Sequence, residues 1–311
     1  MNQIQMAHDN GKPNQSFNRK KINKTKLKTD LVGWGFVSIA AILIFTFFFY
    51  PMVQAFILSL QSGMGINLEF VGFDNYVRLF QDSMFITAVR NTFTYLIVQV
   101  PLMIILALIF SVILNRPDIK GRGFFRTAIF LPAITSLVAY ATVFKYLFGH
   151  NGLVNMALMN IGLIDAPLGW LTTPMLAQIT IIIAITWRWT GYNMIFYLSA
   201  LQNVDQSIYE AAKIDGANAI QQFFKITIPM LKPIILFTSI TSTIGTLQLF
   251  DEAVNITGGG PGNSTMTISQ YIYNLSFRWT PDFGYAATVS YAIVVMIIIL
   301  SIIQFKVAGD K

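Results

Sequence analysis

The 311-residue sequence contains no cysteine and only two histidines, His8 and His150. Without cysteine the chain has no disulfides, no thiolate nucleophile and no cysteine-ligated zinc or iron–sulfur cluster. Two histidines are too few for the histidine-rich sites that bind most transition metals in proteins. We therefore expect neither a metal ion nor another cofactor.

Charged residues are also scarce. They make up 11% of the chain, whereas a soluble globular domain carries about a quarter. Hydrophobic residues reach 54%, and the mean hydropathy is +0.59. Because helices satisfy their own backbone groups in lipid, this composition predicts an all-α integral membrane protein. The net charge of +7 is explained by its topology below, so it indicates no nucleic-acid surface.

Long neutral runs between the charges predict six membrane-spanning helices, each close to the roughly 20 residues that cross a bilayer. The expected spans are residues 31–60, 91–114, 127–148, 175–201, 233–250 and 285–305. The first run is too long for the core of a signal peptide. Residues 1–30 are basic and polar, and we expect a flexible cytoplasmic tail before a single six-span domain, 31–311.

Lysine and arginine are distributed unevenly between the predicted loops. The tail, the loops 116–126 and 202–232, and the C-terminus hold 16 of the 21 basic residues. Cytoplasmic loops are enriched in Lys and Arg, so both termini are expected in the cytoplasm.

The loop between the fourth and fifth spans contains structure of its own. Ser207 and Glu210 have the spacing of a capping box, and Gly216 stands where a helix would end. Ile220, Phe223 and Phe224 then share one face of a second helix. The pattern predicts a helix–glycine–helix element. From these residues alone it is either an amphipathic hairpin at the headgroups or a docking element for a cytoplasmic partner.

Three short motifs in this loop resemble the EAA signature of permease subunits in binding-protein-dependent ABC importers. They are Glu210-Ala211-Ala212, Asp215-Gly216-Ala217 and Ile228-Pro229. Segments 70–76, 152–155 and 257–264 resemble the carbohydrate branch, the maltose and glycerol-3-phosphate type. The chain lacks the extra N-terminal spans and the large external domain of the larger maltose-type subunit.

The resemblance implies the ABC type I importer permease fold in a bacterial inner membrane. It implies that the EAA segment is a coupling helix on a two-subunit ATPase, through Glu210, Ala211, Ala212, Asp215, Gly216 and Ala217. It also implies a second, related permease as heterodimer partner and an external solute-binding protein. No Walker motif occurs in this chain, so the ATPase is expected to be another chain.

A glycine-rich segment, residues 258–262, superficially suggests a phosphate-binding loop. No Lys-Ser or Lys-Thr follows it, and the charge distribution places it outside the cell. We expect a flexible external turn, and by resemblance we expect Gly259, Gly260 and Pro261 to contact the solute-binding protein.

Arg188 interrupts the fourth span, and a charge inside a span usually faces a cavity or a partner. Its neighbours mix aromatic rings, which stack on sugars, with groups that hydrogen bond to hydroxyls. We therefore expect a substrate path lined by Trp187, Arg188, Tyr192, Asn193 and Gln248. Trp189 is expected only to pack. In the alternative interpretation, Arg188 pairs with Asp251, Glu252 or backbone carbonyls.

Acidic residues argue against the rival functions. Asp251 and Glu252 are expected at a solvated helix end, and all 14 acidic residues lie in loops or at span ends. An ion-coupled secondary transporter would need buried acids within its spans, and no convergent catalytic set is visible for an enzyme. The sequence thus predicts the membrane subunit of an ATP-driven sugar importer. The alternatives are import of a non-sugar solute and ion-coupled transport.

Overall fold

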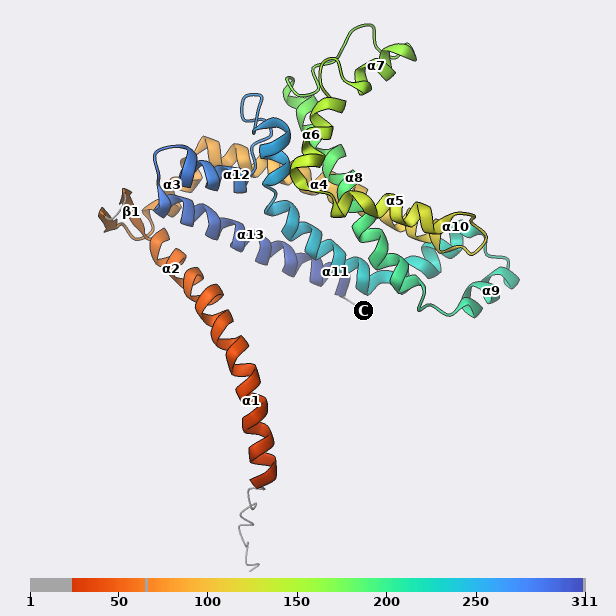
Figure 1. Ribbon diagram of the computed structural model, residues 1–311, viewed down its shortest axis with the longest axis horizontal. Helices are drawn as coiled ribbons and strands as arrows, with labels where there is room; N and C mark the ends of the chain where they lie inside the picture. Colours follow the sequence, from red (N-terminus) through yellow and green to blue (C-terminus); the bar gives the residue numbers. More distant parts are fainter. Residues whose placement is uncertain (1–23, 65–66, 310–311) are drawn as a thin grey trace, which may run out of the picture. The chain divides into compact units, whose positions relative to one another are not determined.

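The computed structural model describes residues 24–64 and 67–309 and is almost entirely helical (Figure 1). It confirms the all-α class and adds one small hairpin that the sequence did not predict. The chain divides into two compact units, residues 1–54 and 55–311. Of the expected flexible tail, residues 1–23 lie outside the described part, and residues 24–30 are helical rather than irregular.

The first unit is a helical run rich in phenylalanine. Helix α1, Lys24–Ile44, continues through a π-helical turn, Phe45–Phe49, into α2, Tyr50–Ser59, where the boundary between the units falls. The side chains of residues 32–54 are exposed. Since most of them are apolar, this run needs lipid or another protein surface around it.

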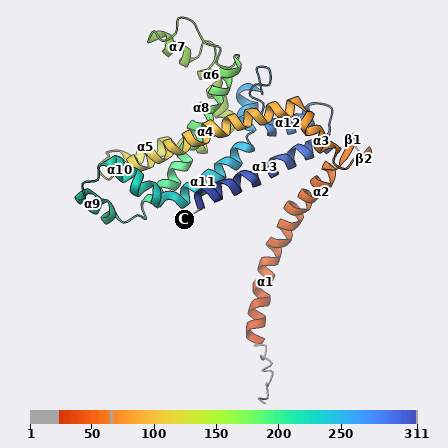
Figure 2. The ribbon, with the colours of Figure 1, turned by 180° about the vertical axis from the view of Figure 1, so that it is seen from behind.

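The second unit begins with the last residues of α2, continues through the antiparallel hairpin, in which Gln61 pairs with Phe70, and then consists of helices (Figure 2). Its elements are β1 Gln61–Met64, β2 Asn67–Phe70, α3 Asp74–Gln81, α4 Ser83–Asn115, α5 Arg122–Ile134, α6 Leu137–Leu147, α7 Leu153–Asn160, α8 Pro174–Leu201, α9 Gln206–Ile214, α10 Ala219–Gln222, α11 Ile228–Leu247, α12 Ile268–Tyr273 and α13 Phe283–Gly309. Three π-helical turns accompany them: Phe223–Thr227, Ala253–Thr257 and Asn274–Arg278.

Helices α4 and α8 form the centre of this unit, with α5 and α11 packed beside them. One buried cluster joins α4, α8 and α11, and within the same contact the Tyr197 hydroxyl lies 2.6 Å from that of Thr238. On the other flank Gly191 lets α5 approach closely. A Cβ at this position would lie 1.9 Å from the carbonyl oxygen of Ile129.

Four of the described helical segments are long and apolar enough to cross a membrane, or five if a bent pair counts as one span. The bent pair is α5 with α6, at 102°, so the expected span 127–148 is not one straight helix. Its break follows Pro132, whose carbonyl accepts hydrogen bonds from the backbone N–H and hydroxyl of Thr135. Proline in a helix interior removes a backbone hydrogen bond and bends the helix.

One other expected span has different bounds in the structure. The helix expected at 233–250 already begins at Ala219 and ends at Leu247. Helix α8 matches the expected 175–201 and has 28 residues, yet it does not reach the hydropathy of a spanning helix. The polar residues around Arg188 lower its hydropathy.

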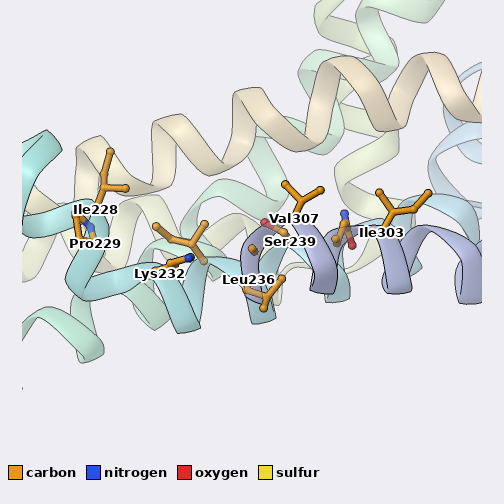
Figure 3. Close-up of a pocket in the computed structure, with 10 residues that line it drawn as sticks. Ile228, Pro229, Lys232, Leu236, Ser239, Ile303 and Val307 are labelled. Atoms are coloured by element: carbon orange, nitrogen blue, oxygen red, sulfur yellow. The ribbon is translucent and has the colours of Figure 1, made fainter. Parts of the chain in front are cut away.

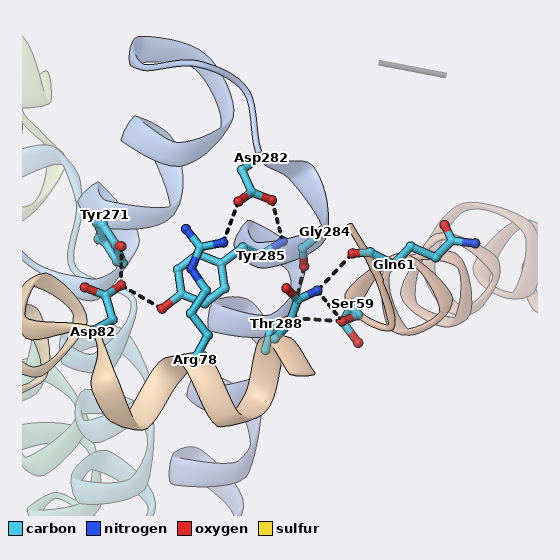
Figure 4. Close-up of polar contacts among 10 residues, drawn as sticks. Ser59, Gln61, Arg78, Asp82, Tyr271, Asp282, Gly284, Tyr285 and Thr288 are labelled. Carbon is cyan, nitrogen blue, oxygen red and sulfur yellow. Dashed lines mark hydrogen bonds and ion pairs between the residues drawn. The ribbon is translucent and has the colours of Figure 1, made fainter. Parts of the chain in front are cut away.

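A polar cluster ties α3 and α4 to α12 and α13 (Figure 4). Asp82 caps α4 by accepting hydrogen bonds from the backbone N–H groups of the next turn, and it also accepts from the hydroxyls of Tyr271 and Tyr285. Arg78 pairs with Asp282 at 2.8 Å and lies 3.8 Å from the centre of the Tyr285 ring. We call these five residues the polar latch.

The hydrogen bonds of the polar latch act on the charge state of Asp82. Burial alone would raise the pKa of this carboxyl. The hydroxyl donors of Tyr271 and Tyr285 and the N–H groups of Phe85 and Met84 outweigh burial and hold the pKa below its ordinary value. Asp82 is therefore a carboxylate at neutral pH, with four donors.

Candidate functional site

A cavity of about 410 Å³ opens between α4, α8 and α11. Its walls mix aromatic, amide, hydroxyl and charged groups. The lining residues are Gln99, Met103, Leu137, Ile185, Arg188, Trp189, Tyr192, Asn193, Thr241, Ser242, Gly245, Thr246, Gln248, Leu249, Phe250, Asp251 and Glu252.

Arg188 is the buried cation of this cavity, with a residue exposure of 6%. Its Nη2 donates to the carbonyl oxygen of Thr135 at 3.3 Å, a group at the break between α5 and α6. Its guanidinium carbon lies 5.0 Å from the Tyr140 ring centre and 5.6 Å from that of Trp189. Nε and Nη1 are buried without a hydrogen-bond partner among the described residues. Arg188 thus has two donor nitrogens left for a ligand.

Two side-chain amides, those of Gln99 and Asn193, also line the cavity. Gln99 of α4 accepts a hydrogen bond from the Thr246 hydroxyl at 3.3 Å and directs its amide nitrogen to the sulfur of Met103. Asn193 donates to the carbonyl oxygen of Trp189 and to the same sulfur. Sulfur is a weak hydrogen-bond acceptor, so the amide nitrogens of Gln99 and Asn193 can donate to a ligand oxygen instead at little cost in free energy. These amides are suited to bind hydroxyl groups.

The structure separates the residues expected to line a substrate path. Arg188, Tyr192, Asn193 and Gln248 lie together at the cavity. Trp187 does not, because its ring packs against Tyr140 and Phe144 on the other side of α8. Instead Trp189, which we expected only to pack, lines the cavity and contacts the Tyr192 ring edge-on at 5.6 Å.

The expectation for Glu252 was wrong. It is not at a solvated helix end: it has an exposure of 4% and lines the cavity together with Arg188. Local sequence could not decide this burial, because it results from a turn beyond α11 that packs against Ile181 and Ile185 of α8. Gln99 and Thr246 were also missed, since single polar residues inside apolar runs have many structural roles.

The helix–glycine–helix element forms as predicted, with one different cap. Helix α9 ends in a Schellman motif: Gly216 has φ +81, its N–H bonds to the Lys213 carbonyl, and Ala217 N–H bonds to the Ala212 carbonyl. Its N-cap is Asp205, which accepts from the Ser207 N–H, so the expected Ser207 capping box is wrong. Asp205 precedes the helix and accepts a hydrogen bond from a backbone N–H group of its first turn, so Ser207 lies inside the helix and does not cap it.

Helix α10 packs back onto the end of α4. Asn218 and Gln221 form its capping box, and the face of Ile220, Phe223 and Phe224 lines a small apolar pocket with residues of α4. The hydroxyl of Tyr209 in α9 lies 3.1 Å from that of Thr227, just before α11. These contacts join the element to two helices of the bundle.

The EAA residues themselves lie at the surface. Glu210, Ala211, Asp215 and Gly216 are exposed, and Ala212 and Ala217 are half-buried. Ile214 beside them is 87% exposed. The neighbouring carboxylate of Asp215 forms no ion pair with any described residue. A large exposed apolar side chain beside such a carboxylate is typical of a binding surface.

The glycine-rich turn is held by threonines rather than open. The Thr265 hydroxyl donates to the Gly260 carbonyl at 2.8 Å and lies 2.7 Å from the Thr257 hydroxyl. Gly259 is buried beneath the Gln270 side chain. Of the three residues expected to contact a binding protein, Gly260 and Pro261 are therefore partly accessible, and the exposed tip is Gly262 with Asn263.

Within residues 24–64 and 67–309, no group of three or more His, Asp or Glu side chains lies close enough together to hold a metal ion. The chemistry that the cavity offers is hydrogen bonding and stacking, from two unpartnered nitrogens of Arg188, amides, hydroxyls and aromatic rings. It is suited to a polar solute that passes through unchanged.

Comparison with known proteins agrees with this arrangement. A family model described as "Binding-protein-dependent transport system inner membrane component" matches residues 84–308. The lactose transport system permease protein LacF of Rhizobium radiobacter is 57% identical over 284 residues, covering 91% of this chain and 95% of LacF. The arabinooligosaccharides transport system permease protein AraP of Halalkalibacterium halodurans is 38% identical over 264 residues, covering 84% of this chain and 82% of AraP.

The fold is found in a solved transporter as well. A chain of the bacterial alginate ABC transporter in complex with alginate pentasaccharide-bound periplasmic protein superposes with a TM-score of 0.76 at 25% identity, covering 90% of this chain and 94% of that chain. The protein is therefore a member of the binding-protein-dependent transport system inner membrane component family, a transport subunit rather than an enzyme.

Proposed function

We propose that this chain is the membrane subunit of an ATP-driven sugar importer and forms the sugar path together with a second, related permease. One observation carries the proposal. The exposed α9–α10 element lies in the chain between α8 and α11, and these two helices line the cavity around Arg188. A push on the element therefore moves two walls of the cavity.

Sugar is the solute class that the cavity favours. Arg188, Asn193 and Gln248 supply donors and acceptors for hydroxyl groups, and Trp189 and Tyr192 supply aromatic faces. The relatives LacF and AraP are named for lactose and arabinooligosaccharides. Their similarity makes lactose the first sugar to test.

The proposed partners follow from the two exposed regions. A two-subunit ATPase binds the coupling element around Glu210, Asp215 and Gly216, and ATP-driven closure of its subunits is transmitted through the α9–α10 turn. An external binding protein delivers the sugar and contacts the glycine-rich turn through Gly260 and Pro261, together with the exposed tip beside them. The periplasmic protein bound to the alginate transporter supports this second contact.

The proposed topology has six spans with both termini in the cytoplasm. Helix α8 is counted as a span, the fourth in chain order, since its 28 residues are long enough to cross a bilayer and its polar middle faces the cavity. The basic loop 116–121, the α9–α10 element and the end of α13 lie at one end of the second unit, with the hairpin and α12 at the other (Figure 1). The positive-inside rule makes the first end cytoplasmic.

Purification from the native membrane tests the proposal. The tagged chain is solubilised gently, and mass spectrometry identifies whatever accompanies it. We expect an ATPase and a second six-span permease. Gly216→Pro should lose the ATPase, because proline cannot adopt φ +81. Gly216→Asn is the matched control and should retain it, since asparagine tolerates this conformation.

The opposite result would favour a different mechanism. A chain that purifies alone and accumulates sugar in vesicles without ATP would be an ion-coupled transporter, in which buried Glu252 would be the first residue to examine. An ATPase that accompanies the chain without sugar uptake would indicate import of a non-sugar solute.

A further inference from the structure

A groove outside the substrate cavity runs between α11 and α13, near the end of α13 (Figure 3). Its volume is about 530 Å³, within the range of small-molecule binding sites. The lining residues are Ile228, Pro229, Lys232, Ile235, Leu236, Ser239, Ile303, Gln304, Val307 and Ala308. None of them lines the cavity around Arg188.

The lining is almost entirely apolar along both helices. Branched aliphatic side chains come from α11 and from α13, and the apolar face continues beyond the groove with Ile302 and Phe305, both more than half exposed. In the proposed topology this stretch lies in the cytoplasmic leaflet. A groove of this kind in a bilayer accommodates an acyl chain at no polar cost.

A single cation stands among these apolar residues. Lys232 is exposed and forms no ion pair with any described residue. The groove lining contains no carboxylate that could neutralise it. A lysine at the end of a span extends its ammonium group toward the headgroups while its methylene stem packs on apolar surface. In the proposed topology, the groove thus combines an apolar trough with a positive charge in the first turns of α11, toward its cytoplasmic end.

We propose that this groove binds one anionic phospholipid of the cytoplasmic leaflet, with an acyl chain between α11 and α13 and its phosphate at Lys232. Basic pockets between spanning helices on the cytoplasmic side bind anionic lipid headgroups in the same way. The inference rests on the orientation proposed above. Since α11 also lines the substrate cavity, the lipid steadies a helix that the coupling element moves.

Charge complementarity distinguishes this occupant from a helix of another protein. A lipid supplies an anionic head and an apolar tail in one molecule, as this groove requires. A helix would need a carboxylate of its own placed opposite Lys232. The experiment below includes that possibility as an outcome.

Lipid retention measures the site directly. The full chain, with whatever chains accompany it, is delipidated in detergent and incubated with equal amounts of phosphatidylglycerol and phosphatidylcholine of the same acyl composition. Native mass spectrometry then counts the lipids retained. We expect one phosphatidylglycerol to be retained preferentially. Lys232→Gln should lower that preference about fivefold, the effect of one cation near a membrane surface.

Two further variants make the test specific. Lys306→Gln removes a charge at the same end of the bundle from a residue outside the groove, and it should leave the preference unchanged. Ala308→Phe fills the groove and should reduce retention of both lipids. An unchanged preference in Lys232→Gln, or retention unaffected by Ala308→Phe, would overturn the proposal.

The proposal would also be overturned if Val307→Cys cross-linked to a cysteine placed on an accompanying permease, because a protein helix would then occupy the groove. The assay uses neither ATP nor sugar, so its result is independent of whether the chain belongs to an ATP-driven importer.

Discussion

At the scale of one residue, the unpartnered nitrogens of Arg188 favour binding of a ligand in the cavity. A buried N–H group without a partner costs about 1–3 kcal/mol, and Arg188 has two nitrogens in this state. The Thr135 carbonyl and the rings of Tyr140 and Trp189 compensate only part of the cost. Charged residues persist inside membrane proteins where they act on a substrate or a partner. A sugar whose hydroxyls accept from both nitrogens would remove the remaining cost.

The two tryptophans beside Arg188 provide a matched pair for testing the cavity. Trp189 lines it and Trp187 does not. Trp189→Leu should slow uptake of saturating sugar roughly fivefold, because one aromatic contact is worth about 1 kcal/mol. Trp187→Leu should leave the rate per assembled transporter unchanged. Uptake of radiolabelled lactose, normalised to the amount of complex in the membrane, measures both. Equal losses in the two variants would mean that the cavity is not the path.

At the scale of single helices, the sequence predicts some helix ends and not others. The sequence indicated the end of α9 at Gly216 correctly, because a Schellman motif depends on a few adjacent residues. It misplaced the start of that helix and did not reveal the cap of α4. Asp82 is identified as part of the polar latch only by its hydrogen bonds with Tyr271 and Tyr285, which are 189 and 203 residues away in the sequence. Local capping rules cannot find partners at that separation.

The polar latch gives a stability prediction with a defined pH dependence. Asp82→Asn should lower the free energy of unfolding at neutral pH by about 1–2 kcal/mol, because the four donors lose a charged acceptor. The folded-state pKa of Asp82 is below its ordinary value of 3.8. Its stabilisation is therefore complete above the ordinary value and is lost only as the pH falls through the lower folded-state pKa.

Thermal unfolding of the purified protein between pH 4.5 and 8 checks this behaviour, since a difference between wild type and variant should persist across that range at about the same size. Asp118→Asn is a suitable control, because this carboxylate pairs with Arg116 at the surface. A difference that vanished near pH 6 would contradict the assignment of Asp82 as the charged acceptor.

At the scale of the whole molecule, the absence of cysteine makes the topology easy to test. Ser207→Cys lies in the α9–α10 element and Asn263→Cys at the tip of the glycine-rich turn, and both residues are exposed. A membrane-impermeant maleimide should label the Asn263 variant in intact cells or spheroplasts. It should label the Ser207 variant only after permeabilisation. The reverse pattern would invert the proposed orientation and place the lipid groove in the outer leaflet.

The sequence by itself determined the membrane class, the family resemblance and the helix–glycine–helix element, because composition, motif spacing and helix caps depend on neighbouring residues. The tertiary structure alone decided that Glu252 is buried, that α5 and α6 bend by 102°, and that Trp189 rather than Trp187 faces the cavity. Each of these depends on how one helix is rotated and packed against another. In an apolar chain, lipid and protein interior are equally favourable surroundings for a side chain, so hydropathy could not distinguish the two faces of α8.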